Sequence, residues 1–216
     1  MRHKAVLFDL DGTLLDTLQD IADSVNLVLE RLGFPQHEVD AYRYFVGDGR
    51  EILASRVLPG DKRDADTIDM LDKYIGEEYA KRQFNNARPY PGIPGMLDSL
   101  TDLGIKMAIL TNKPEDSTGE MVKQLLSRWH FETVVGASSS VPRKPDPTGA
   151  LRIAKQLSLP PTSFLYLGDS DVDMKTAKAA GMYPLGALWG FCTADELLAN
   201  GAVELVHHPL DLIKLL

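Results

Sequence analysis

Short apolar runs bounded by Gly, Asp or Asn recur along the chain and alternate with amphipathic stretches. Such runs are typical of strands that are buried on both faces of a sheet. The predicted strands are 5–8, 107–110, 133–136, 164–167, 185–188 and, as a sixth, 202–206. The predicted helices between and after them are 93–103, 116–129, 147–158, 171–181 and 210–216. This alternation predicts an α/β fold with a parallel sheet.

One region breaks the alternation, because from about residue 16 to residue 88 the pattern is helical throughout. A helix over 17–32 has an apolar stripe at spacings of three and four residues, and Gly33 ends it. Further helices are predicted near 38–46, 49–57 and 64–85. The segment Ala-Arg-Pro-Tyr-Pro-Gly at 87–92 has the composition of a rigid turn and predicts the return to the sheet. The predicted domains are a helical cap domain at 16–88 and an α/β core domain at 1–15 and 89–216.

Composition and charge exclude several classes of partner. The formal net charge of -8 over 216 residues disfavours nucleic acid and anionic membranes, which require a basic face. The apolar runs are shorter than the roughly 20 residues of a membrane span, and the first residues do not have the pattern of a signal peptide. The single cysteine, Cys192, cannot form an internal disulfide. We therefore expect a cytoplasmic protein, either a monomer or a homodimer.

Polar side chains follow four of the predicted strands, at the sheet edge where open parallel sheets bind their ligands. They are Asp9 and Asp11 after the first strand, Thr111 and Asn112 after the second, Arg143 and Lys144 in the loop after the third, and Asp169, Ser170, Asp171 and Asp173 after the fourth. We expect these carboxylates, the hydroxyl of Thr111 and one or two cations to converge on one edge.

Asp9 and Asp11 are two residues apart, so their side chains project from the same face of an extended chain. The two carboxylates would repel each other, which suggests a cation beside them. Asp169 would complete a set of hard oxygen ligands suited to Mg²⁺. Gly12 allows the backbone to turn closely around whatever binds there.

Four segments, in this order, resemble the motifs of the haloacid dehalogenase-like hydrolases. They are Phe-Asp-Leu-Asp-Gly-Thr-Leu-Leu-Asp at 8–16, Leu-Thr-Asn-Lys at 110–113, Lys-Pro-Asp-Pro at 144–147 and Leu-Gly-Asp-Ser-Asp-Val-Asp at 167–173. The likeness covers nearly the whole chain, and segments within 189–202 are similar to those of phosphoglycolate phosphatase-type members. The resemblance implies a Rossmann-like parallel sheet with a helical cap domain inserted after the first strand.

The resemblance also implies hydrolysis of a small, phosphoglycolate-like phosphate monoester with Mg²⁺. Asp9 would attack phosphorus and form an aspartyl phosphate, which divides one difficult displacement into two. Asp11 would protonate the leaving oxygen and then deprotonate the hydrolytic water. Lys144 would neutralise the phosphoryl group and Asp9, and Thr111 would hold a phosphoryl oxygen.

The metal ligands implied are Asp9, Asp169 and the backbone carbonyl of Asp11. Asp173, with Ser170 beside it, is expected to act through a neighbour by orienting Lys144 or a metal-bound water.

Two interpretations are open for each of the other polar groups that could line the site. Asn112 and Lys113 either line the site or belong to a solvated loop. In the cap, two glycines precede Arg50 within the segment 45–53, so Arg50 either binds an anionic group of the substrate or lies in an ordinary turn. This segment resembles the corresponding cap loop of phosphoglycolate phosphatases.

Three other functions compete with a phosphatase. A sugar-phosphate mutase forms the same aspartyl phosphate, but the stretch 47–50 bears little resemblance to a sugar-binding loop. A phosphonate hydrolase requires a cap lysine for a Schiff base, and no lysine lies near residues 47–56. A non-enzymatic regulator that binds a phosphometabolite is disfavoured because all the motif residues are intact.

Overall fold

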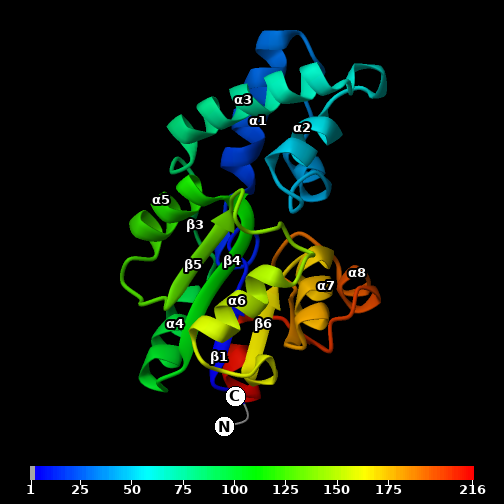
Figure 1. Cartoon of the computed structure of the whole chain (residues 1–216). Coiled ribbons are helices and arrows are strands. Elements are labelled where there is room, and N and C mark those ends of the chain that lie inside the picture. Colours follow the sequence, from blue (N-terminus) through cyan, green and yellow to red (C-terminus); the bar gives the residue numbers. More distant parts are fainter. Residues whose placement is uncertain (1–2) are drawn as a thin grey trace.

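The computed structural model describes residues 3–216, and its centre is a six-stranded sheet in the order β5-β4-β1-β6-β7-β8 (Figure 1). The strands are β1 (Ala5–Phe8), β4 (Lys106–Pro114), β5 (Thr133–Ala137), β6 (Phe164–Gly168), β7 (Tyr183–Ala187) and β8 (Glu204–Val206). Each neighbouring pair is parallel. The predicted α/β fold with a Rossmann-like parallel sheet is therefore confirmed.

Strand β1 lies in the middle of the sheet, and all four of its residues are fully buried. Leu7 pairs with Ala108 of β4 on one side and with Tyr166 of β6 on the other. A strand covered on both faces must be apolar at every position, which explains why it appears as an uninterrupted apolar run.

Helices cover both faces of the sheet. They are α4 (Ile93–Asp102), α5 (Glu115–Leu125), α6 (Thr148–Gln156), α7 (Asp171–Ala180), α8 (Ala194–Ala199) and the 3₁₀ helices η3 (Pro161–Ser163) and η4 (Pro209–Leu215). Apolar residues of α4, α5 and η4 share one buried cluster with β1, and those of α6 and α7 form another on the opposite face. The strand ends between these layers are thereby held in fixed positions.

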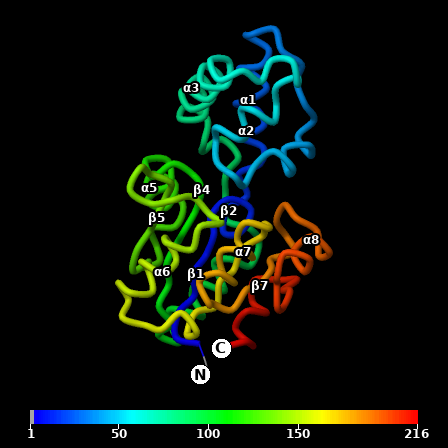
Figure 2. The backbone as a smooth tube through the Cα atoms, turned by 45° about the vertical axis from the view of Figure 1, so that its right-hand side comes forward, coloured from blue at the N-terminus to red at the C-terminus, as the bar shows by residue number. Residues whose placement is uncertain are grey.

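A helical insertion lies between β2 (Leu15–Asp16) and β3 (Arg88–Pro89), which pair with each other in antiparallel fashion. Its elements are α1 (Leu18–Leu32), η1 (Val39–Tyr44), α2 (Arg50–Val57), η2 (Gly60–Lys62) and α3 (Ala65–Arg82). They enclose a hydrophobic cluster of their own, and Figure 2 shows the insertion beyond one end of the sheet. The boundaries of the two domains, at 15/16 and 88/89, stay a prediction.

Several elements differ from the sequence-based expectation. Strand β4 continues to Pro114 instead of ending at 110, so the polar residues 111–113 lie within a strand. The predicted helices at 38–46 and 210–216 are 3₁₀ helices, and α8 was not predicted. No helix in the described part of the chain is long and apolar enough to cross a bilayer.

Candidate active site

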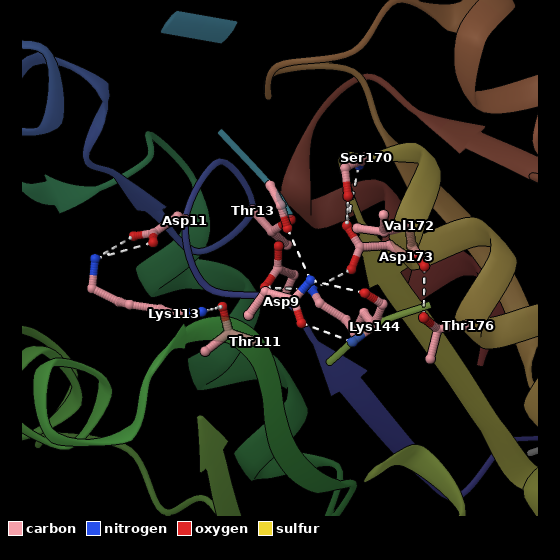
Figure 3. Close-up of polar contacts among 12 residues, drawn as sticks. Asp9, Asp11, Thr13, Thr111, Lys113, Lys144, Ser170, Val172, Asp173 and Thr176 are labelled. Carbon is pink, nitrogen blue, oxygen red and sulfur yellow. Dashed lines mark hydrogen bonds and ion pairs between the residues drawn. The ribbon is translucent and has the colours of Figure 1, made fainter. Parts of the chain in front are cut away.

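Asp9 directly follows β1 and is 6% exposed. Its backbone N–H donates to the carbonyl of Leu167 at 3.0 Å, which ties the end of β1 to β6. Its Oδ1 lies 2.9 Å from the Nζ of Lys144 (Figure 3). Apart from this ion pair, Oδ1 has no hydrogen-bond partner among residues 3–216. Asp9 thus presents an oxygen that can accept another ligand.

Lys144 lies between two carboxylates, because its Nζ is also 2.6 Å from Oδ1 of Asp173. Its side chain is almost fully buried, and its backbone N–H donates to Oδ1 of Asn112 at 2.8 Å. Burial opposes the charged ammonium, but the negative charges of Asp173 and Asp9 prevail and hold the pKa of Lys144 well above its usual range. Lys144 is therefore a fixed positive charge next to Asp9.

Asp173 is held by the start of α7. Its Oδ2 accepts from the backbone N–H of Ser170 at 3.1 Å and from the Ser170 hydroxyl at 2.5 Å, so both donors of the N-cap residue bind this oxygen. Its Oδ1 accepts from Lys144 and, at 3.3 Å, from the hydroxyl of Tyr166. The arrangement allows Ser170 to position Asp173, and Asp173 to position Lys144.

Asp169 follows β6 and is completely buried. Its Oδ1 accepts from the hydroxyl of Thr13 at 2.7 Å, and its Oδ2 accepts from the backbone N–H of Phe191 at 2.9 Å. Gly12 has φ +83°, and a Cβ at this position would overlap the Asp169 carboxylate. Gly12 therefore allows the loop after β1 to approach Asp169 closely.

The three carboxylates Asp9, Asp169 and Asp173 fit a divalent cation, since oxygens from all three lie within 4.8 Å of one another. Burial, and then the charge of Asp173, raise the pKa of Asp9 to about 6. Burial, followed by the negative charges of Asp9 and Asp173, raises the pKa of Asp169 well above its usual range. A hard cation would offset this repulsion. Each oxygen of Asp173 already accepts from two donors, whereas each oxygen of Asp169 accepts from one and Oδ1 of Asp9 pairs with Lys144 alone. Asp9 and Asp169 are therefore the better placed ligands.

Asp11 lies apart from this cluster, on the other side of Asp9 in the view of Figure 3. Its two carboxylate oxygens are 3.2 and 3.0 Å from the Nζ of Lys113, and Oδ1 accepts from the hydroxyl of Thr17 at 2.8 Å. Lys113 is buried and also donates to the hydroxyl of Tyr79 on α3, at 2.8 Å. The interpretation of Lys113 as a solvated loop residue is therefore wrong.

Thr111 and Asn112 also lie within the buried part of β4. The hydroxyl of Thr111 accepts from the backbone N–H of Lys113 at 3.3 Å. The amide of Asn112 donates to the backbone carbonyls of Gly47 and Lys144, at 3.0 and 3.1 Å. Asn112 thus joins β4, the insertion and the loop of Lys144, and substrate contact by either residue stays a prediction.

A cavity of about 90 Å³ lies between the insertion and the strand ends. Asp9, Asp11, Thr111, Asn112 and Lys113 line it from the core, and the insertion contributes Ile21, Val46, Gly47, Gly49, Arg50, Leu53, Ile75 and Tyr79. Arg50 lines this cavity, but its guanidinium is held by Asp72 of α3 through two hydrogen bonds of 2.8 and 2.9 Å. The predicted anion contact of Arg50 stays a prediction.

Sequence reasoning missed four residues of this region. Thr13 belongs to the same motif as Asp9, and its position next to Gly12 is a local signal that it would lie near the site. Thr17 contacts Asp11 only six residues earlier and directly follows the first motif, which is also a local signal. Tyr79 and Phe191 give no such signal, because their contacts depend on how distant segments fold together.

A family model described as haloacid dehalogenase-like hydrolase matches residues 6–187. The chain is 35% identical to a phosphoglycolate phosphatase of Pseudomonas putida over 87% of this chain and 70% of that protein. It is 31% identical to a phosphoglycolate phosphatase of Aquifex aeolicus, over 99% of this chain and 96% of that protein.

Solved structures show the same similarity. A predicted phosphoglycolate phosphatase from Haemophilus somnus has a TM-score of 0.91 at 25% identity and covers 100% of this chain and 98% of that one. A haloacid dehalogenase-like family hydrolase from Streptococcus pneumoniae has a TM-score of 0.89 at 25% identity, with 99% and 98% covered.

Proposed function

Since the chain belongs to the haloacid dehalogenase-like hydrolase family, we propose that it is a Mg²⁺-dependent phosphatase acting on a small phosphate monoester through phosphorylation of Asp9. Phosphoglycolate is the first candidate substrate, because several similar proteins are named for its hydrolysis. The observation that carries the proposal is the placement of Asp9, which lines the cavity and whose Oδ1 pairs with Lys144 alone.

In the proposed first step, an oxygen of Asp9 attacks phosphorus and the ester oxygen leaves. Asp11 lines the same cavity and delivers a proton to that oxygen. In the second step, Asp11 removes a proton from the water that attacks the aspartyl phosphate, which regenerates Asp9 and releases inorganic phosphate.

The other residues stabilise charge during both steps. Lys144 is buried beside Asp9 and would neutralise the phosphoryl oxygens, while Asp173 holds its ammonium in place. The hydroxyl and backbone N–H of Thr111 would hold one phosphoryl oxygen. Asp9, Asp169 and the carbonyl of Asp11 would bind Mg²⁺, which when bound supplies further positive charge for the phosphoryl oxygens.

The size of the cavity limits the substrate. Typical ligand pockets measure about 300–1,000 Å³, whereas this one measures about 90 Å³. A short organic phosphate therefore fits better than a nucleotide or a phosphoprotein.

A phosphate-release screen tests the proposal. Phosphoglycolate and other small esters are incubated with the protein in Mg²⁺ and in excess EDTA, with Asp9→Asn as the control. We expect release with the wild type in Mg²⁺ only. Release by Asp9→Asn at even a tenth of the wild-type rate would remove Asp9 from the role of nucleophile.

A further inference from the structure

We infer that Lys113 is a specificity-determining residue, whose buried ammonium binds an anionic group, such as a carboxylate, on the leaving-group side of the phosphate ester. The inference rests on the proposed phosphatase function. Lys113 and Arg50 are the cationic residues lining the cavity among residues 3–216, and the side chain of Lys113 is only 5% exposed.

The position of Lys113 separates it from the phosphoryl group. Figure 3 shows Lys144 on one side of Asp9 and the pair of Lys113 and Asp11 on the other. Under the proposed mechanism Asp11 lies within hydrogen-bond distance of the leaving oxygen. Because the Nζ of Lys113 is 3.0 Å from Oδ2 of Asp11, the next few atoms of the leaving group lie close to this ammonium. A carboxylate attached to the carbon of the ester is therefore within reach of Lys113.

The hydrogen bonds of Lys113 leave room for a substrate oxygen. Oδ1 of Asp11 is shared, since it accepts from Thr17 at 2.8 Å and from Lys113 at the longer distance of 3.2 Å. An ammonium has three N–H donors, and those of Lys113 go to the two oxygens of Asp11 and to Tyr79. A substrate carboxylate oxygen can replace Oδ1 as the acceptor of one N–H, which leaves Oδ1 with Thr17 and Oδ2 with Lys113. The contact to Tyr79 holds the lysine stem in place during this exchange.

The surroundings of Lys113 favour an anion. Ile21, Leu53 and Ile75 form apolar walls of the cavity, which exclude water and strengthen an ion pair. The first turns of α2 and α5 also line the cavity, through Arg50 and Ser117. Each helix N-terminus adds partial positive charge, and acidic side chains in the same turns offset part of it.

Arg50 is less suited to this role, although it lines the same cavity. Its guanidinium forms a two-pronged ion pair with both oxygens of Asp72. It also packs against Gly76 of α3, where a Cβ would overlap its Nη1. To bind a substrate, Arg50 would have to give up this pair, whereas Lys113 would give up one long hydrogen bond.

Two matched substrates test the assignment: phosphoglycolate and its carboxamide, which have nearly the same size but differ in the charge of the tail. The readout is kcat/KM for the acid divided by kcat/KM for the amide. We expect Lys113→Met to lower this acid-to-amide ratio by roughly 10–100-fold, because one hydrogen bond between charged groups is lost. Lys113→Arg is expected to restore part of the ratio. Lys123→Met, an exposed site on α5, is the matched control and should keep the wild-type ratio.

Equal losses on both substrates would show that Lys113 has only a structural role, and would overturn the assignment. The assignment would also be overturned if Arg50→Ala lowered the acid-to-amide ratio of kcat/KM and Lys113→Met did not. If Lys113→Met does not fold, as judged by circular dichroism, Tyr79→Phe decides. Loss of its hydrogen bond to Lys113 should lower the ratio by roughly 2–10-fold, and an unchanged ratio contradicts the assignment. If the wild type hydrolyses neither ester in Mg²⁺, the proposed function itself has failed.

Discussion

Replacing Asp9 with Asn is expected to stabilise the metal-free protein above pH 6, although it removes the proposed nucleophile. Burial, followed by the charge of Asp173, raises the pKa of Asp9 from 3.8 to about 6. A carboxyl whose pKa is higher in the folded state contributes stability that is fully present below pH 3.8 and is lost as the pH rises through 6. A difference of about two pH units corresponds to roughly 3 kcal/mol. Asn is neutral at every pH and does not incur this loss.

Urea unfolding in excess EDTA, at pH 4 and at pH 8, measures the effect. From pH 4 to pH 8, the difference in free energy of unfolding between Asp9→Asn and the wild type should shift by roughly 2–3 kcal/mol in favour of the mutant. Asp102→Asn, at an exposed position at the end of α4, is the control and should show no comparable gain. A mutant whose stability relative to the wild type does not increase at pH 8 would refute the electrostatic account of Asp9.

Three further predictions concern the metal, the acid and the glycine of the first motif. Excess EDTA should abolish activity and Mg²⁺ restore it, whereas Ca²⁺, with its looser coordination, should support little turnover; full activity in chelator would contradict the metal site. Asp11→Asn should slow turnover of a poor leaving group by roughly 10²–10⁴-fold, yet an activated ester should still phosphorylate Asp9; behaviour identical to that of Asp9→Asn would contradict the separate roles. Gly12→Ala should abolish the rise in melting temperature that Mg²⁺ gives the wild type, because the added Cβ overlaps Asp169. Gly104 also has a positive φ, but nothing lies within 4 Å of its added Cβ, so Gly104→Ala should keep the stabilisation by Mg²⁺.

The sheet could be predicted because its strands are buried on both faces. β1 and β6 are fully buried, so each is a continuous apolar run in the sequence. The end of β4 could not be located in the same way, because its last residues are polar and still buried, as in Lys113. The C-terminal 3₁₀ helix begins at Pro209, and apolar spacing over so few residues does not distinguish it from an α-helix.

Part of the candidate site followed from the sheet alone. Asp9, Lys144, Asp169 and Asp173 converge because the carboxyl ends of parallel strands meet at one edge. The contacts made by the insertion could not be predicted in this way. The pairing of Arg50 with Asp72 depends on how α2 packs against α3, and no local pattern in the sequence reports that packing.

The most direct test of the central claim is a search for the phosphorylated enzyme. The wild type and Asp11→Asn are mixed with a small phosphate ester and Mg²⁺, quenched with acid, and digested for mass spectrometry. We expect one phosphoryl group on the peptide that contains Asp9, and none in Asp9→Asn. Phosphate release by the wild type without this label, or a label that persists in Asp9→Asn, would contradict the proposed role of Asp9.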